Sequence, residues 1–228
     1  MSTASHSIAE NWIRDYLEPR YPELVAPYRE AGRITANALQ SGHLEEAELQ
    51  VLLGHVASSK SVLSNNVGDM LGKLAQVFPS ALQALEHMAQ SNKVGLRVQA
   101  LSAMRHLPPS PLHERMYATA MADRNKKVRM LAAQNAQSQA MAVLLPALEQ
   151  AIAREEDADT RHHLLRCRNL LRDGHVQETD AAGNVWITCC FKSGTTSRMF
   201  TRTRFETDGT AWIAKNAAEW RANWYGQP

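Results

Sequence analysis

Residues 123–133 read DRNKKVRMLAA, and two other stretches repeat this pattern at a fixed distance. Residues 91–101 read SNKVGLRVQAL, and residues 155–165 read EEDADTRHHLL. In each stretch a polar turn leads into a run with helical spacing, and an arginine is the second residue of that run. These arginines are separated by 32 residues, twice over: Arg97, Arg129 and Arg161. A period of this length is typical of stacked helical hairpins, so the sequence predicts an α-solenoid.

The middle stretch also carries a family pattern. Asp123 is followed by four variable residues, then by the pair Val128-Arg129, and then by the pair Ala132-Ala133. This arrangement resembles HEAT-like repeats, especially the short repeats of phycobilisome-lyase-type proteins. The resemblance covers about residues 80–172, and Thr160 departs from it because the pattern has valine at that position.

The resemblance implies a structural role for the three arginines. In such repeats, they pair with acidic residues of the turns, here Asp123 and Glu155, and tie successive units together. The alternative is a ladder of guanidinium groups that binds phosphates or carboxylates. Their regular spacing favours the structural role, because ligand sites are seldom periodic.

The composition agrees with a mainly α-helical protein. Of the 228 residues, 44% are hydrophobic, 21% are charged and only 6% are aromatic. The three cysteines form no disulfide framework, which favours a reducing compartment. The sequence starts without the pattern of a signal peptide, and its longest apolar stretch, residues 140–148, is too short to span a bilayer. We therefore expect a cytoplasmic protein that does not bind a membrane.

Charge is distributed unevenly along the chain. The formal net charge is only +2, but residues 1–75 hold 6 basic and 9 acidic side chains, whereas residues 96–172 hold 12 basic and 7 acidic ones. The excess of basic side chains in the middle of the chain would attract an acidic partner.

The N-terminal part has helical patterns without a clear repeat. The run from Val62 to Phe78 contains Gly68 and Gly72, and glycine is unfavourable inside a helix by about 1 kcal/mol relative to alanine. We therefore expect this helix either to be irregular or to let a neighbouring helix approach closely.

The helical pattern stops at Gly174, a plausible residue for the end of a helix. Residues 185–192 alternate between two faces, and residues 198–205 and 210–214 are predicted as further strands. Asn216 with Glu219 resembles a capping box that opens a last helix. We therefore predict a mainly α protein in which a HEAT-like α-solenoid, residues 1–174, is followed by a small antiparallel β-meander and a terminal helix, residues 175–228.

Two surfaces are candidates for binding. The second helices of such hairpins usually line the concave side of a solenoid, so outward positions beside the arginines form a mixed polar and basic groove that suits a protein segment. These positions are Arg105, Met130, Gln134, Gln137, His162, Arg166 and Asn169. The alternative for them is an ordinary solvated face.

The second surface is the strand predicted over residues 198–205. It places Arg198, Arg202 and Arg204 on one side, with Phe200 between them, and such a pattern is suited to nucleic acid or to an acidic protein patch. The alternative is a solvent-facing strand whose arginine stems cover neighbouring side chains.

No residue pattern points to catalysis, a metal or a cofactor. Adjacent His162 and His163 point in different directions on a helix, and the pair His163 and Cys167 lacks a further ligand. Cys189 and Cys190 would lie on opposite faces of a strand. Phosphate loops, nucleophile elbows and metalloprotease motifs do not occur.

The sequence therefore predicts a non-catalytic protein-binding module of the adaptor, assembly-factor or toxin-immunity type. One alternative is nucleic-acid binding through the basic middle of the chain. Another is a lyase of the phycobilin type, which only the repeat resemblance suggests.

Overall fold

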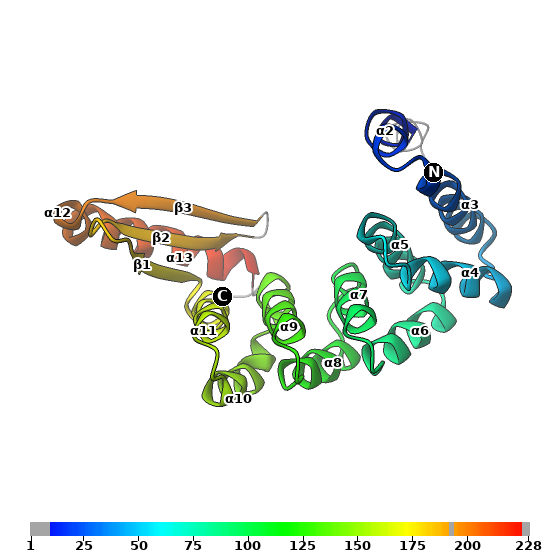
Figure 1. The fold of residues 1–228 in the computed structure, drawn as a ribbon. Helices are drawn as coiled ribbons and strands as arrows, with labels where there is room; N and C mark the ends of the chain where they lie inside the picture. The colour runs from blue at the N-terminus through cyan, green and yellow to red at the C-terminus, as the bar shows by residue number, and fades with distance from the viewer. Residues whose placement is uncertain (1–9, 192–193, 225–228) are drawn as a thin grey trace. The chain divides into compact units, whose positions relative to one another are not determined.

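The computed structural model describes residues 10–191 and 194–224, and these residues are mainly helical with a small antiparallel sheet near the C-terminus (Figure 1). The chain divides into two units, Met1–Pro108 and Pro109–Pro228. The boundary expected at residue 174 lies within the second unit, so the sheet shares a unit with helices.

From residue 10 onward, the first unit contains helices and no strand. Its longer helices are α3 (Val25–Ser41), α4 (Glu46–Val56), α5 (Ser61–Leu74), α6 (Pro79–Ala89) and α7 (Val94–Met104). Three short segments precede them: η1 (Ile13–Leu17), α2 (Glu18–Arg20) and η2 (Pro22–Leu24). Helix α5 packs against α3 on one side and α7 on the other, while α4 packs on α5 and α6 packs on α7.

The glycines of α5 allow the close approach that the sequence suggested. A Cβ atom on Gly72 would lie 2.4 Å from the carbonyl oxygen of Ala103 in α7. A Cβ atom on Gly68 would lie 3.0 Å from Oε1 of Gln99 in the same helix. The backbones of α5 and α7 are therefore in contact where α5 has no side chain.

The second unit begins with four helices in two hairpins. They are α8 (Pro111–Met121), α9 (Lys126–Ser138), α10 (Leu145–Arg154) and α11 (Ala158–Asp173), with the short helix η3 (Ala142–Leu144) before α10. Side chains cap the starts of three of them, since Ser110, Asn125 and Asp157 accept hydrogen bonds from backbone N–H groups of the first turn. Gly174 adopts a left-handed conformation, with φ of 77°, and ends α11 as predicted.

The sheet follows directly and runs in the order β1-β2-β3. Its strands are β1 (His175–Thr179), β2 (Val185–Phe191) and β3 (Gly194–Phe200). Both neighbouring pairs are antiparallel, and Trp186 of β2 lies opposite Glu178 of β1 and Met199 of β3.

The prediction for this region was partly wrong. Strand β1 was not predicted, and β3 ends at Phe200 instead of continuing to residue 205. Residues 210–214 are helical: α12 (Arg202–Arg204), η4 (Phe205–Gly209) and α13 (Thr210–Trp224) follow the sheet. The last helix therefore begins at Thr210, before Asn216. Lys192, the last residue of the strand predicted over residues 185–192, lies outside the described residues.

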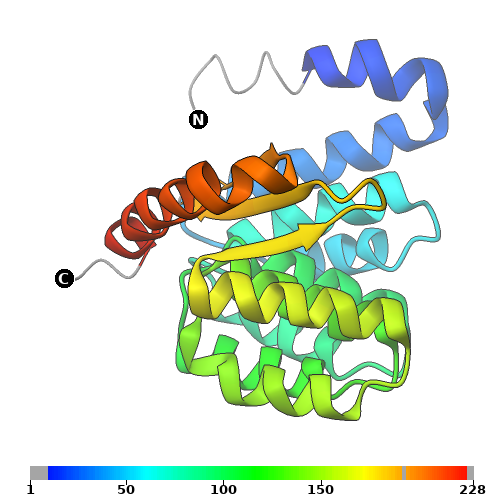
Figure 2. The ribbon, with the colours of Figure 1, turned by 90° about the vertical axis from the view of Figure 1, so that its left-hand side faces the viewer.

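Helix α13 covers one face of the sheet (Figure 2). The buried side chains of that face are Val185, Ile187, Cys189 and Phe200, and they pack against Phe205, Trp212 and Ile213. The last three recur at helical spacing, which explains why this segment folds as a helix: a helix buries them together, whereas a strand would direct Trp212 and Ile213 to opposite faces.

Candidate functional site

Two of the periodic arginines make the same backbone contact. The guanidinium group of Arg97 donates to the carbonyl oxygen of Ser91 at 2.8 Å, and that of Arg129 donates to the carbonyl oxygen of Asp123 at 2.8 Å. Each bond reaches back six residues and holds the turn before the helix. Arg161, at the third position of the series, is exposed.

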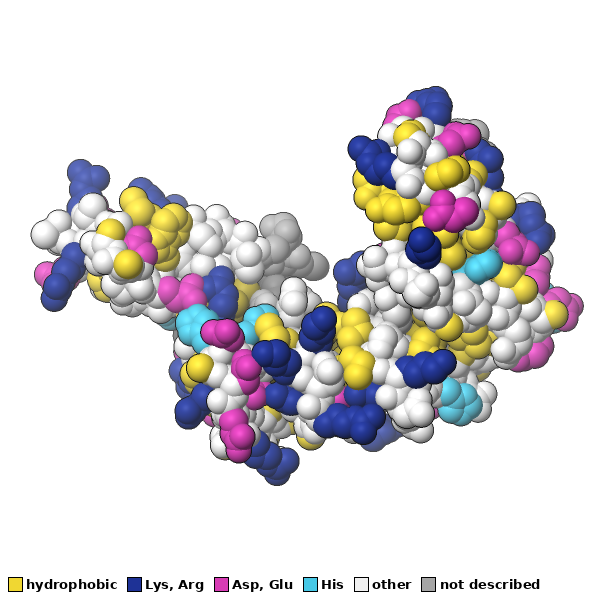
Figure 3. Space-filling view, in the orientation of Figure 1, with side chains coloured by type: hydrophobic (Ala, Val, Ile, Leu, Met, Phe, Trp, Pro, Cys, Tyr) yellow, Lys and Arg dark blue, Asp and Glu magenta, His cyan; other side chains and the backbone are white. Residues whose placement is uncertain are grey.

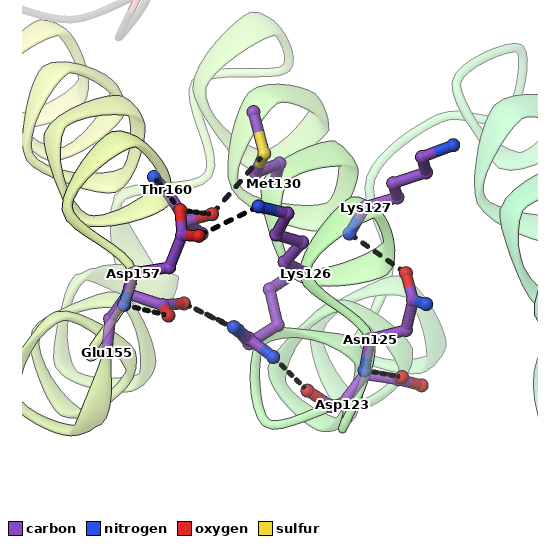
Figure 4. A network of polar contacts seen from close by, with 9 residues as sticks. Asp123, Asn125, Lys126, Lys127, Met130, Glu155, Asp157 and Thr160 are labelled. Atoms are coloured by element: carbon purple, nitrogen blue, oxygen red, sulfur yellow. Dashed lines mark hydrogen bonds and ion pairs between the residues drawn. The ribbon is translucent and has the colours of Figure 1, made fainter.

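Arg129 also links two successive hairpins, because it bonds to Asp123 and to Glu155, which Figure 4 labels. Its Nε donates to Oε2 of Glu155 at 2.7 Å, and the Glu155 side chain is only 3% exposed. The other carboxylate oxygen of Glu155 accepts from the backbone N–H of Asp157 at 3.1 Å. This arginine therefore stabilises the turn between α10 and α11 from α9.

A second ion pair lies beside the first. Nζ of Lys126 donates to Oδ2 of Asp157 at 2.8 Å, and the other carboxylate oxygen accepts from the backbone N–H and the hydroxyl group of Thr160 (Figure 4). These bonds, that of Lys126 foremost, hold the pKa of Asp157 well below its ordinary value. The charged groups at the start of α9 thus connect to the next hairpin.

The outward positions predicted on α9 differ in accessibility. Gln134 is exposed and Met130 is half-buried, but Gln137 is buried, and its amide group donates to Sγ of Cys190 at 3.0 Å. The expectation that Gln137 faces an open groove was therefore wrong. Cys190 of β2 therefore contacts this end of α9.

Two residues of α11 that were predicted to line a groove, His162 and Arg166, contact a carboxylate that the sequence did not single out. Arg166 forms an ion pair with Glu178 of β1, and His162 lies 3.1 Å from the other carboxylate oxygen of Glu178. Arg166 also donates to the hydroxyl group of Thr188 at 3.4 Å. Figure 3 shows basic, acidic and histidine side chains together over α11 and β1. Only a weak signal for a strand was present there, because residues 175–179 contain a single apolar side chain, Val176.

The remaining predicted residues have separate surroundings. Asn169 accepts a hydrogen bond from Arg168, its neighbour on α11. Arg105 belongs to the first unit, where it pairs with Asp69 at 3.0 Å.

The three arginines of the predicted strand are not on one strand. Arg198 lies on β3, with its guanidinium group 5.1 Å from the ring centre of Phe200, whereas Arg202 and Arg204 are exposed on α12. Phe200 is buried under α13 and is not available for stacking on a base. The interleaved arrangement that suited nucleic acid is therefore absent from the described residues of this region.

The sheet face opposite α13 carries exposed apolar side chains. Trp186 is 41% exposed and Met199 is 46% exposed, and the two lie directly opposite each other on β2 and β3. At the other end of this face, Val176 and Cys190 are buried against Leu170 of α11. One half of the face is therefore covered by α11, and the half around Trp186 and Met199 is open.

The Trp186 indole is held in place. Its N–H group donates to Oδ2 of Asp180 at 3.0 Å, and Asp180 in turn accepts from the backbone N–H groups of Ala182 and Asn184. These bonds, that of Trp186 foremost, lower the pKa of Asp180 below its ordinary value. Trp186 is thus an exposed aromatic side chain with a fixed orientation.

All three cysteines are free and buried. Burial raises the pKa of Cys167 and Cys190 to about 12 and that of Cys189 to about 11, so these thiols lack thiolate character at neutral pH. Within residues 10–191 and 194–224, no group of histidine, cysteine and carboxylate side chains has the arrangement of a metal site.

Each unit also has a shallow pocket between helices. A pocket of about 560 Å³ in the first unit lies between α4 and α6, with Leu53 and Met88 inside and Glu46 and His87 among its polar residues. A pocket of about 360 Å³ in the second unit lies between α8 and α10 and contains Arg129.

Comparison with known proteins identified no relative. No family model matches the chain, and the searches of curated proteins and of solved structures also gave no match. In the part of the chain that the structure describes, every helix is too short or too polar to cross a membrane.

Proposed function

We propose that this chain is a non-catalytic protein-binding module and that its binding surface is the open half of the sheet in the second unit. This surface, called here the Trp186 face, consists of Trp186 and Met199 with the adjoining pair of Arg166 and Glu178. The observation that carries the proposal is the exposure of a fixed tryptophan beside an exposed methionine.

The composition of the Trp186 face supports this proposal. Tryptophan, methionine and arginine are enriched in protein interfaces, and tryptophan and arginine dominate their binding energy. A side chain already fixed by Asp180 loses little conformational entropy when a partner packs on it. A surface of this kind binds a protein without any catalytic group.

The repeat pattern supports the same class of function. The resemblance of residues 80–172 to HEAT-like repeats favours a solenoid scaffold, and helical repeats commonly present binding surfaces. Within this proposal, the helices of the second unit hold the sheet, and the protein acts in the cytoplasm.

The test is affinity capture from lysate of the native cells with the tagged full-length chain, followed by quantitative mass spectrometry. The variant W186A/M199A should lose the proteins that the wild type enriches. Val143 is 61% exposed in the same unit, so V143A is a matched control that should retain them. If W186A/M199A retains the same proteins at the same level, the Trp186 face is not the binding surface.

A further inference from the structure

The open edge of β3 is the feature that specifies what kind of partner the Trp186 face accepts. Among residues 10–191 and 194–224, the sheet order is β1-β2-β3, and strand β3 is bonded to β2 on one side only. Its residues 195–199 are all exposed, Met199 among them. Natural proteins usually cover or blunt such edges, because an unpaired row of N–H and C=O groups pairs with other chains.

The register shows which backbone groups face this edge. The N–H group of Cys190 donates to the carbonyl oxygen of Gly174 at 3.0 Å, so Cys190 directs its backbone groups towards β1. Because direction alternates along a strand, the odd-numbered residues of β2 are bonded to β3, and these pair with even-numbered residues such as Arg198. The outward N–H and C=O groups of β3 therefore belong to Thr195, Ser197 and Met199.

The side chains near this edge define the chemistry of an added strand. The side chains of Thr195, Ser197 and Met199 lie on the Trp186 face. A strand that pairs with β3 would therefore place a side chain next to Met199, in line with Trp186. Arg198 points to the other face, and Arg202 and Arg204 follow it on α12. A strand that fits has an apolar residue opposite Met199 and an acidic residue opposite Arg198.

We infer that β3 binds an extended protein segment with alternating apolar and acidic residues, which adds to the sheet as a fourth strand. This inference rests on the proposed function, because it specifies the partner of the same surface. Main-chain bonds to β3 supply affinity, and the two faces supply specificity. A second copy of the chain fits less well, because it would bring its own Arg198, Arg202 and Arg204 to the same edge.

The first test uses a capped nonapeptide of alternating valine and glutamate, with lysine in place of glutamate as the matched control. Amide hydrogen exchange is followed residue by residue by NMR in the full-length protein. At a peptide concentration of about nine times Kd, exchange at Thr195, Ser197 and Met199 should slow by about tenfold, since one edge in ten is then free. Unchanged exchange at these three amides overturns the inference.

Two variants test the backbone and charge contributions separately. S197P removes an outward N–H group and should abolish binding of the acidic peptide, whereas S197A loses only the hydroxyl bond to Thr188 and should retain it. R198E needs no change of backbone and should weaken binding of the acidic peptide by about tenfold while improving binding of the lysine peptide. Equal binding by S197P and S197A, or an unchanged charge preference in R198E, refutes strand addition.

The outcome also separates this inference from the proposed function. If lysate capture is lost in W186A/M199A but retained in S197P, the Trp186 face binds its partner without an added strand and the inference fails alone. If both variants retain capture, the proposed function fails as well. If light scattering shows that the wild type dimerises and S197P does not, a second copy of the chain occupies the edge of β3. That result overturns the inference that β3 binds an acidic segment of another protein.

Discussion

The close contact between α5 and α7 predicts opposite effects for two glycine-to-alanine substitutions in the first unit. In G72A the new methyl group would lie 2.4 Å from the carbonyl oxygen of Ala103, and 3.2 Å from its Cα. These are backbone atoms of a neighbouring helix, so the clash is relieved only when α5 and α7 move apart. In G54A the methyl group meets nothing within 4 Å, although Gly54 is also inside a helix.

The magnitudes follow from two terms. Replacing glycine by alanine inside a helix stabilises the folded state by about 1 kcal/mol. Overpacking of a well-packed interface costs about 1–3 kcal/mol, and Gly72 belongs at the upper end because backbone has to move. We therefore expect G72A to lower the free energy of unfolding by about 2 kcal/mol, and G54A to raise it by about 0.5–1 kcal/mol.

Urea unfolding followed by circular dichroism measures both effects, provided that the slope of the transition is the same in all variants. G68A is an internal comparison, because its methyl group would meet only the side-chain oxygen of Gln99, which rotates away more easily. We expect its midpoint to lie between those of G72A and G54A. If G72A unfolds at the same urea concentration as the wild type or a higher one, the packing of α5 on α7 is wrong.

Three further predictions concern the second unit. R129M should lower the free energy of unfolding by about 2–4 kcal/mol because it leaves the buried Glu155 without its partner, whereas R161M at an exposed position should change it by less than about 0.5 kcal/mol; similar urea midpoints for both variants would contradict the structural role of Arg129. The lowered pKa of Asp157 means that its carboxylate stabilises the folded state fully above its ordinary pKa of about 3.9 and loses this effect as the pH falls towards the folded-state value. The difference in urea midpoint between wild type and D157N should therefore narrow below about pH 3.9, and a difference that widens in acid would refute this assignment. Burial should keep the thiols of Cys167, Cys189 and Cys190 from reacting with Ellman's reagent in the folded protein at about pH 8. All three thiols should react in urea. Rapid reaction without urea would show that the thiols are accessible in the folded protein.

Periodic features were predictable from the sequence. The helices around the three arginines and the end of α11 at Gly174 lie where the pattern indicated, because local spacing and turn residues determine them. The two glycines of α5 indicated either an irregular helix or a close helix contact, and the sequence did not identify α7 as the neighbour. That identity depends on which helices stack, and stacking is a tertiary property.

The C-terminal region was predicted less well for a definite physical reason. Residues 210–214 alternate over too short a distance to distinguish a strand from a helix, and only the contact of Trp212 and Ile213 with the sheet decides between them. Strand β1 has one buried apolar residue, Val176, so its pattern is weak without its partner β2. Glu178 was missed for the same reason.

The contacts of the second unit explain why recognition should be sought outside the repeat positions. Arg129 is one of the periodic arginines, and Lys126 lies three residues before it. Both form ion pairs with acidic side chains of the next hairpin, Glu155 and Asp157. A charge that holds a neighbouring hairpin is not free for a partner. Trp186 and Met199 lie beyond the repeat, in a sheet that needs neither side chain for its packing on α11 or α13. Under the proposed function, packing of a partner on these two side chains removes apolar surface from water.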